Sequence, residues 1–195
     1  SRFDTLFFDP FSSRVRFELA NGIEGRFTEL SGYVLLDSEM DTVASLRLVL
    51  DATSAVPTGS NQEGVDLLGP RRLDAERYPE VIYEATRIRG DTTAGSNVSI
   101  IEGALTLWGK TQALPLPASV RITGRTVAIN ASFDVSPVAW DSTGAHDTSP
   151  VSVRAQLVAR PRDVPAPGAS LRANQRYQDS LARTTPLLSD STSRD

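Results

Sequence analysis

The sequence predicts an all-β fold of antiparallel strands, and three features of the chain support this prediction. Apolar and polar residues alternate with period two through much of residues 15–159, as side chains do on the two faces of a strand. Helical spacing is nearly missing from the same region. Turn residues separate the alternating stretches, most clearly at Asn21-Gly22, a pair that favours tight hairpins. Sequential hairpins predict an antiparallel meander.

The clearest strands are expected at residues 46–50, 127–133 and 151–159, each with apolar residues at every second position. Pro161 ends the last of them, because proline has no N–H to donate to a strand partner. Residues 120–122 also alternate clearly, and they end a less regular strand that runs from residue 112 into residue 120. The other less regular strands cover residues 14–20, 25–37, 81–89 and 98–107, which brings the expected total to about eight.

Two long irregular stretches, residues 53–73 and 136–150, interrupt the strands. The first leads into an expected short helical turn at residues 74–78. Long loops in compact domains are more often functional than accidental, so we expect both at the mouths of a barrel. Alternation alone leaves two architectures open, since eight antiparallel strands can close into a barrel or pack as two sheets.

The chain is expected to hold one β domain over residues 1–160, followed by a proline-containing linker and a polar tail over residues 161–195. The tail has too few apolar residues to form a core.

Composition excludes several classes of function. A net charge of −4 argues against a nucleic-acid partner. Without cysteine, the chain has no disulfide and no thiol nucleophile. No apolar run approaches the roughly 18 to 20 residues that span a bilayer, so the chain is not expected to be transmembrane. The start at Ser1 fits either removal of a leader peptide or a chain trimmed for expression.

Catalytic chemistry finds little support in the residues. The single histidine, His146, lies between Asp141 and Asp147 in a loop-like stretch, where the three side chains could gather a divalent ion. The favoured interpretation is a solvated polar loop. We therefore expect no enzyme, no catalytic residue, no metal site and no cofactor.

Several segments resemble, in order and spacing over about residues 7–160, the YceI-like family of polyisoprenoid-binding proteins. Gly25-Arg26-Phe27 followed by Ser31-Gly32 resembles its second strand, and Tyr78-Pro79 precedes a strand as in the family. The block from Gly103 to Thr111, GALTLWGKT, is the most specific match. The chain departs from the family at Gly64-Val65-Asp66-Leu67, where members commonly carry an Arg-Asp or His-Leu pair.

The resemblance implies a closed, lipocalin-like barrel whose interior holds one long apolar ligand. From the residues alone, the inward apolar positions are either a packed core or a cavity lining, and Trp108 and Trp140 are placed either at a rim or in the core. The expected lining comprises Leu46, Leu48, Leu50, Ile82, Leu105, Leu107, Val120, Ile122, Val127, Ile129, Val153, Leu157, Trp108 and Trp140.

Three functions follow as hypotheses. The leading one is a carrier for an isoprenoid, quinone, carotenoid or related lipid, located in the periplasm or elsewhere in the extracytoplasmic cell envelope. The second is a structural subunit of an envelope complex, with a filled barrel and residues 164–195 docking on a protein partner. The third, a metal-dependent envelope enzyme, has the least support.

Overall fold

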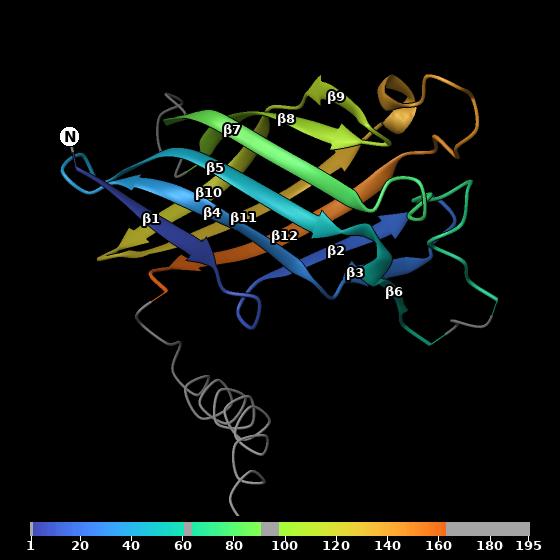
Figure 1. Cartoon of the computed structure of the whole chain (residues 1–195), viewed down its shortest axis with the longest axis horizontal. Helices are drawn as coiled ribbons and strands as arrows, with labels where there is room; N and C mark the ends of the chain where they lie inside the picture. Colours follow the sequence, from blue (N-terminus) through green and yellow to red (C-terminus); the bar gives the residue numbers. More distant parts are fainter. Residues whose placement is uncertain (1, 61–63, 91–97, 163–195) are drawn as a thin grey trace, which may run out of the picture. The chain divides into compact units, whose positions relative to one another are not determined.

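The computed structural model describes residues 2–60, 64–90 and 98–162, and these residues form an antiparallel β structure (Figure 1). The all-β prediction is therefore confirmed. The strands are β1 (Phe3–Phe8), β2 (Arg14–Leu19), β3 (Glu24–Phe27), β4 (Leu30–Asp37), β5 (Thr42–Asp51), β6 (Ala55–Thr58), β7 (Glu80–Gly90), β8 (Ser99–Leu107), β9 (Lys110–Ala113), β10 (Leu116–Thr123), β11 (Thr126–Val135) and β12 (Val151–Arg160).

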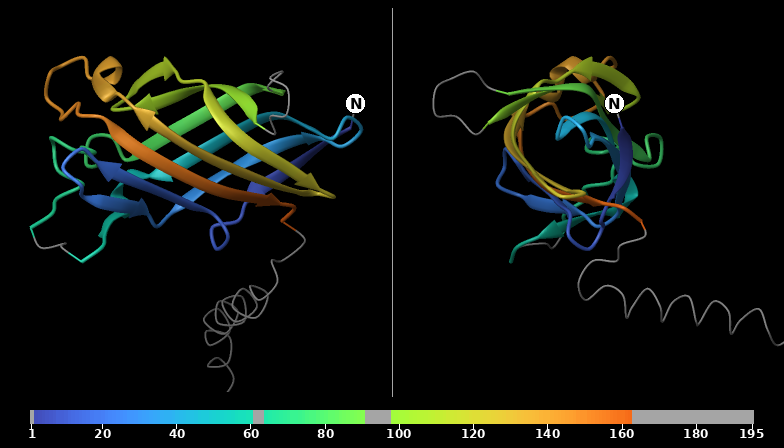
Figure 2. Two further views of the ribbon diagram at one scale, coloured as in Figure 1. Left: turned by 180° about the vertical axis from the view of Figure 1, so that it is seen from behind. Right: turned by 90° about the vertical axis from the view of Figure 1, so that its left-hand side faces the viewer.

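Eight strands close into a barrel, in the order β1-β4-β5-β7-β8-β10-β11-β12. The ring closes where β1 pairs with β12, with Phe7 opposite Arg160 and Phe8 opposite Ala159. Figure 2 shows the closed ring end-on. Closure pairs the strand edges that an open sheet would leave exposed. The structure thus decides for the barrel over the two-sheet alternative.

The remaining strands extend the wall near one end of the barrel. There β12 leaves β1 and pairs with β2 from Val151 to Gln156, and β3 and β6 follow in order. The long strand expected over residues 25–37 is broken at Thr28-Glu29, whose backbone N–H groups donate to Ser54. As a result β3 pairs with β2 and β6, whereas β4 pairs with β1 and β5.

Two strands, β1 and β6, were not expected from the sequence. Strand β1 carries apolar residues on both faces, and β6 is only four residues long with Pro57 inside it. Residues 74–78 form a single turn closed by a hydrogen bond from the Tyr78 N–H to the Asp74 carbonyl. The described helices are two 3₁₀ turns, η1 (Ala52–Ser54) and η2 (Pro137–Trp140).

One glycine shows how closely β4 and β5 approach. Gly32 has a φ of +127°, and a Cβ at this position would lie 1.9 Å from the Arg47 carbonyl oxygen. Any side chain would push the two strands apart, because glycine alone leaves this space free and adopts this conformation at no steric cost. Gly32 therefore holds the register in which it faces Leu48.

The two ends of the barrel differ. The end where β12 meets β1 is filled by eight buried side chains and is here called the packed end. These side chains are Leu6, Phe8, Val34, Leu36, Val43, Ala85, Val127 and Ala159.

No helix in the described part of the chain is long and apolar enough to cross a membrane.

Candidate ligand cavity

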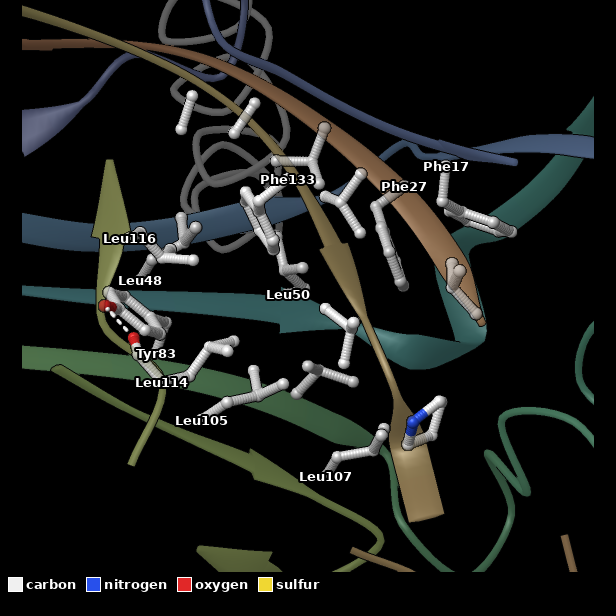
Figure 3. Close-up of a pocket in the computed structure, with 18 of the residues that line it drawn as sticks. Phe17, Phe27, Leu48, Leu50, Tyr83, Leu105, Leu107, Leu114, Leu116 and Phe133 are labelled. Atoms are coloured by element: carbon white, nitrogen blue, oxygen red, sulfur yellow. Dashed lines mark hydrogen bonds between the residues drawn. The ribbon is translucent and has the colours of Figure 1, made fainter. Parts of the chain in front are cut away.

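The other part of the barrel encloses a cavity of about 200 Å³, here called the hollow half. Its lining is almost entirely apolar. The polar side chains in it are Tyr83, inside the barrel, and Arg72, Asp147 and Ser149 at one end. In Figure 3 the labelled side chains converge on this common space: Phe17, Phe27, Leu48, Leu50, Tyr83, Leu105, Leu107, Leu114, Leu116 and Phe133.

Strand alternation positions the lining. Leu46, Leu48 and Leu50 occupy every second position of β5, so all three face inward, as the sequence predicted. The neighbouring strand β7 continues the same face, with Tyr83 paired to Leu48 and Val81 paired to Leu50. The cavity wall is therefore a continuous apolar surface across several strands.

Tyr83 brings a polar atom into this wall. Its hydroxyl donates to the Leu114 carbonyl oxygen at 2.7 Å, which satisfies the buried O–H. Burial raises the pKa of the Tyr83 phenol above its usual range. Gly103 makes room for the ring, since a Cβ there would lie 2.5 Å from it. The hydroxyl is thus already hydrogen-bonded without a ligand.

Nine of the fourteen side chains expected to line the cavity do line it: Leu46, Leu48, Leu50, Leu105, Leu107, Trp108, Ile129, Val153 and Leu157. Whether they bind a ligand stays a prediction.

The other five lie elsewhere. The prediction that Ile82 lines the cavity is wrong by one position, because Val81 and Tyr83 are the inward positions of β7. Val127 faces inward but belongs to the packed end. Val120 and Ile122 are half-buried and pack against the core without reaching the cavity. Trp140 is buried in a side cluster, where its indole N–H donates to the Leu105 carbonyl oxygen at 2.8 Å.

Other lining residues were missed. Phe17 and Phe27 pack together with ring centroids 5.4 Å apart, and both line the cavity from strands of irregular pattern. Phe17 faces inward in the alternation of β2, which is a signal that the sequence contains. Leu114 follows the end of β9, and no periodicity marks it.

Three segments meet at the polar end of the cavity, here called the mouth. They are residues 67–78, the β8–β9 turn at Trp108-Gly109, and the loop 141–149. Arg72 and Asp147 form an ion pair of 2.8 Å across the mouth. The same two residues also line a second hollow, which has both apolar and charged side chains. The ion pair therefore stands between the cavity and the surface.

His146 is buried beside the mouth, so the expectation of a solvated polar loop is wrong. Its Nε2 lies 3.0 Å from an Asp74 oxygen and its Nδ1 lies 3.0 Å from an Asp141 oxygen. The three side chains are only 4–5 % exposed. The hydrogen bond from His146 holds the pKa of Asp141 below its usual range. Asp147 instead turns to Arg72, and hydrogen bonds from Ser149 lower its pKa.

The position of Trp108 depends on an unusual turn. Trp108 and Gly109 have φ values of +50° and +71° between paired residues Leu107 and Lys110, a conformation in which asparagine or glycine is usual. The indole N–H donates to the Arg72 carbonyl oxygen at 3.0 Å. The ring stacks on His146 with centroids 4.0 Å apart and planes 7° from parallel. Trp108 thus sits at the mouth and joins all three segments.

In the described part of the chain no group of three His, Asp or Glu side chains is arranged to hold a metal ion. Each ring nitrogen of His146 lies within hydrogen-bond distance of a carboxylate oxygen, so both nitrogens have a partner within the protein. The expected tail, residues 161–195, lies outside the described residues beyond Arg162.

Solved structures share this fold. BcnA from Burkholderia cenocepacia is 23% identical, with a TM-score of 0.60 over 77% of this chain and 98% of its own. A polyisoprenoid binding domain from Saccharophagus degradans is 16% identical, with a TM-score of 0.57 over 82% and 99%. The YceI protein of Campylobacter jejuni is 14% identical, with a TM-score of 0.55 over 71% and 84%. Among curated proteins no match is found.

The fold and cavity define a hollow eight-stranded antiparallel barrel with an apolar interior. Residues 7–159 match the YceI-like domain. The chain belongs to the YceI-like domain family.

Proposed function

We propose that this protein is a non-catalytic carrier that holds one long apolar ligand, such as an isoprenoid, quinone or carotenoid, in the cell envelope. The observation that carries the proposal is the cavity in the hollow half, whose inner wall is apolar apart from Tyr83 and whose charged groups, Arg72 and Asp147, lie at the mouth. Transfer of an apolar chain from water into such a space is favourable by about 25 cal/mol per Å² of buried area.

The polar groups inside the cavity support binding rather than catalysis. The Tyr83 hydroxyl is already bonded to the Leu114 carbonyl oxygen. At the mouth, Arg72 and Asp147 neutralise each other. A ligand with a long apolar body and a small polar end fits this distribution of groups. The Saccharophagus degradans relative, described as a polyisoprenoid binding domain, supports the same ligand class.

The envelope location is part of this proposal and rests on the ligand class, because long isoprenoids reside in membranes. Native mass spectrometry of the protein purified from its source, followed by organic extraction, tests the ligand directly. An extracted isoprenoid lipid is the expected result. A protein that is consistently free of lipid, and that retains no added geranylgeraniol, contradicts the carrier function.

A matched pair of variants tests whether the ligand binds inside the cavity. Ala131 lines the cavity, whereas Ala128 occupies the outward face of the same strand, β11. Ala131→Leu fills space that the ligand would occupy, so geranylgeraniol binding should weaken by about tenfold or more, as expected when an apolar contact surface is replaced by a clash. Ala128→Leu should leave binding unchanged. Equal effects of the two variants would place the ligand outside the cavity.

A further inference from the structure

The loop 141–149 closes the mouth without any apolar anchor of its own. Its two ends are fixed, at Trp140 by burial and a hydrogen bond, and at Val151 by the start of β12. Between residues 142 and 149 the only buried side chain is His146. A segment that buries no apolar side chain is not held in place by the hydrophobic effect. Polar contacts must therefore hold this loop against the barrel.

Three contacts join the loop to residues 71–74. The Asp147 N–H donates to the Arg71 carbonyl oxygen at 2.7 Å, and the Asp147 carboxylate pairs with Arg72. The Arg72–Asp147 pair is about one-third exposed on each side, so solvent weakens it. The third contact, between His146 and Asp74, is almost fully buried. Because it is buried, solvent and salt screen it much less than they screen the Arg72–Asp147 pair.

Acidic and aromatic side chains surround His146. Its two ring nitrogens each lie 3.0 Å from a carboxylate oxygen, one of Asp74 and one of Asp141. Arg77 lies 3.7 Å from Asp74 and supplies a positive charge on the other side of that carboxylate. The imidazole ring stacks on the face of Trp108. The Tyr78 ring, edge-on at 6.3 Å, completes the surroundings.

We propose that the loop 141–149 is a movable flap, here called the door, which moves away from residues 71–74 to admit the apolar ligand. The contact between His146 and Asp74, here called the latch, holds the loop closed, and its release limits the rate of ligand exchange. The inference rests on the proposed carrier function. Gly144 lies within this loop with a φ of +70°, a conformation that glycine adopts at no steric cost. Opening removes Asp147 and Ser149 from the mouth and exposes the apolar wall behind them.

His146 does not line the cavity, and this separates a latch from a ligand contact. His146→Gln keeps one donor end but places an acceptor against the other carboxylate. Association and dissociation of geranylgeraniol should both become faster by about tenfold or more, the effect of losing one charge-assisted hydrogen bond from the closed state. The Kd should stay nearly constant, because both rates rise together.

Arg89→Gln serves as the control. It breaks an ion pair with Glu102 away from the mouth, near the far ends of β7 and β8, and should change neither rate. Asp141→Asn is the second latch variant; it removes a charge, keeps an acceptor, and should accelerate exchange to a smaller extent. Unchanged rates in both latch variants would place the door elsewhere.

A reversible lock tests the same door without removing His146. The natural chain has no cysteine, so Arg71→Cys with Asp147→Cys supplies the only two thiols, on residues whose backbones are hydrogen-bonded. After closure with a short thiol cross-linker or a disulfide, probe exchange should stop, and reduction of the disulfide should restore it. Equal exchange in the locked and reduced protein would overturn the proposal.

Amide hydrogen exchange makes the latch testable apart from the carrier function. In His146→Gln the Asp147 N–H should exchange faster, while the Asp9 N–H, bonded to the Val158 carbonyl oxygen, should not change. Failure of every variant to bind the probe contradicts the carrier function alone. Normal probe binding with unchanged Asp147 exchange contradicts the latch alone.

Discussion

The packed end and the hollow half belong to the same barrel, share several strands, and use the same apolar residue types, but only one of them is filled. At the packed end β12 pairs directly with β1, and side chains such as Leu6 and Leu36 are fully buried. Toward the mouth β12 pairs with β2, followed by β3 and β6. Barrel diameter grows with the number of strands in the wall. The added strands therefore leave a space that side chains of ordinary size do not fill.

This difference teaches that inward-facing apolar residues have two roles in one domain. At the packed end they stabilise the fold by close packing. In the hollow half they form the apolar wall of a cavity. Matched substitutions in the two regions should therefore differ in their effects on stability.

Truncation in the packed end should be the most damaging change. Leu36 is fully buried, and Leu36→Ala should lower the free energy of unfolding by about 3 to 5 kcal/mol, because a new void opens in a close-packed core. Leu48→Ala only enlarges the existing cavity and should cost about 2 kcal/mol or less. Urea denaturation measures both. Equal losses would mean that the hollow half is packed as tightly as the other end.

Enlarging a side chain should also cost more stability at the packed end than in the hollow half. Ala159 is fully buried at the packed end, so Ala159→Leu should cost about 1 to 3 kcal/mol by overpacking. Ala131, on the neighbouring strand, borders the cavity, and Ala131→Leu should cost less than about 1 kcal/mol. Thermal melting of the two variants gives the comparison. A large loss in Ala131→Leu would show that the cavity cannot accept extra volume.

Tyr83 tests the contribution of a buried hydroxyl inside the hollow half. Tyr83→Phe leaves the Leu114 carbonyl oxygen without this donor and should cost about 1 kcal/mol. The raised pKa of Tyr83 also predicts a pH effect. Folding favours the neutral phenol, so its stability contribution is complete below about pH 10 and is lost as pH rises further.

An absorbance titration of phenolate checks this effect. Because burial raises its pKa, Tyr83 should ionise only when the barrel unfolds. Tyr83→Phe should therefore remove the signal that accompanies alkaline unfolding. An unchanged signal in Tyr83→Phe would contradict the burial of Tyr83.

The smallest expected effect is a loss of stability at the mouth as the pH falls. The lowered pKa values of Asp141 and Asp147 mean that both carboxylates stabilise the mouth above the usual aspartate range near pH 3.9. That contribution is lost as pH falls through their lower values in the folded protein. Amide exchange near Asp147 should rise there before the packed end loses protection. Simultaneous loss at both ends would show that the mouth does not open independently.

Several features could be predicted from residues alone, because they depend on local periodicity. Alternation in β5, β11 and β12 determined which side chains face inward, since successive residues of a strand point to opposite sides. The turn between β8 and β9 lies within the segment GALTLWGKT, whose resemblance to known family members indicated the barrel. Strand β1 was not predictable in this way, because its aromatic residues occupy both faces.

The tertiary structure alone decided what the inward residues do. Val127 and Ile129 belong to the same alternation on β11, yet one is packed and the other lines the cavity, because strand pairing around the ring sets the local width. His146 carries no signal in the sequence, since Asp74 lies 72 positions away and Trp108 lies in another hairpin. Residues so far apart acquire a shared environment only through closure of the barrel. The sequence therefore determined which side chains face inward on each strand. Long-range packing decided where a cavity remains and which side chains lie at its mouth.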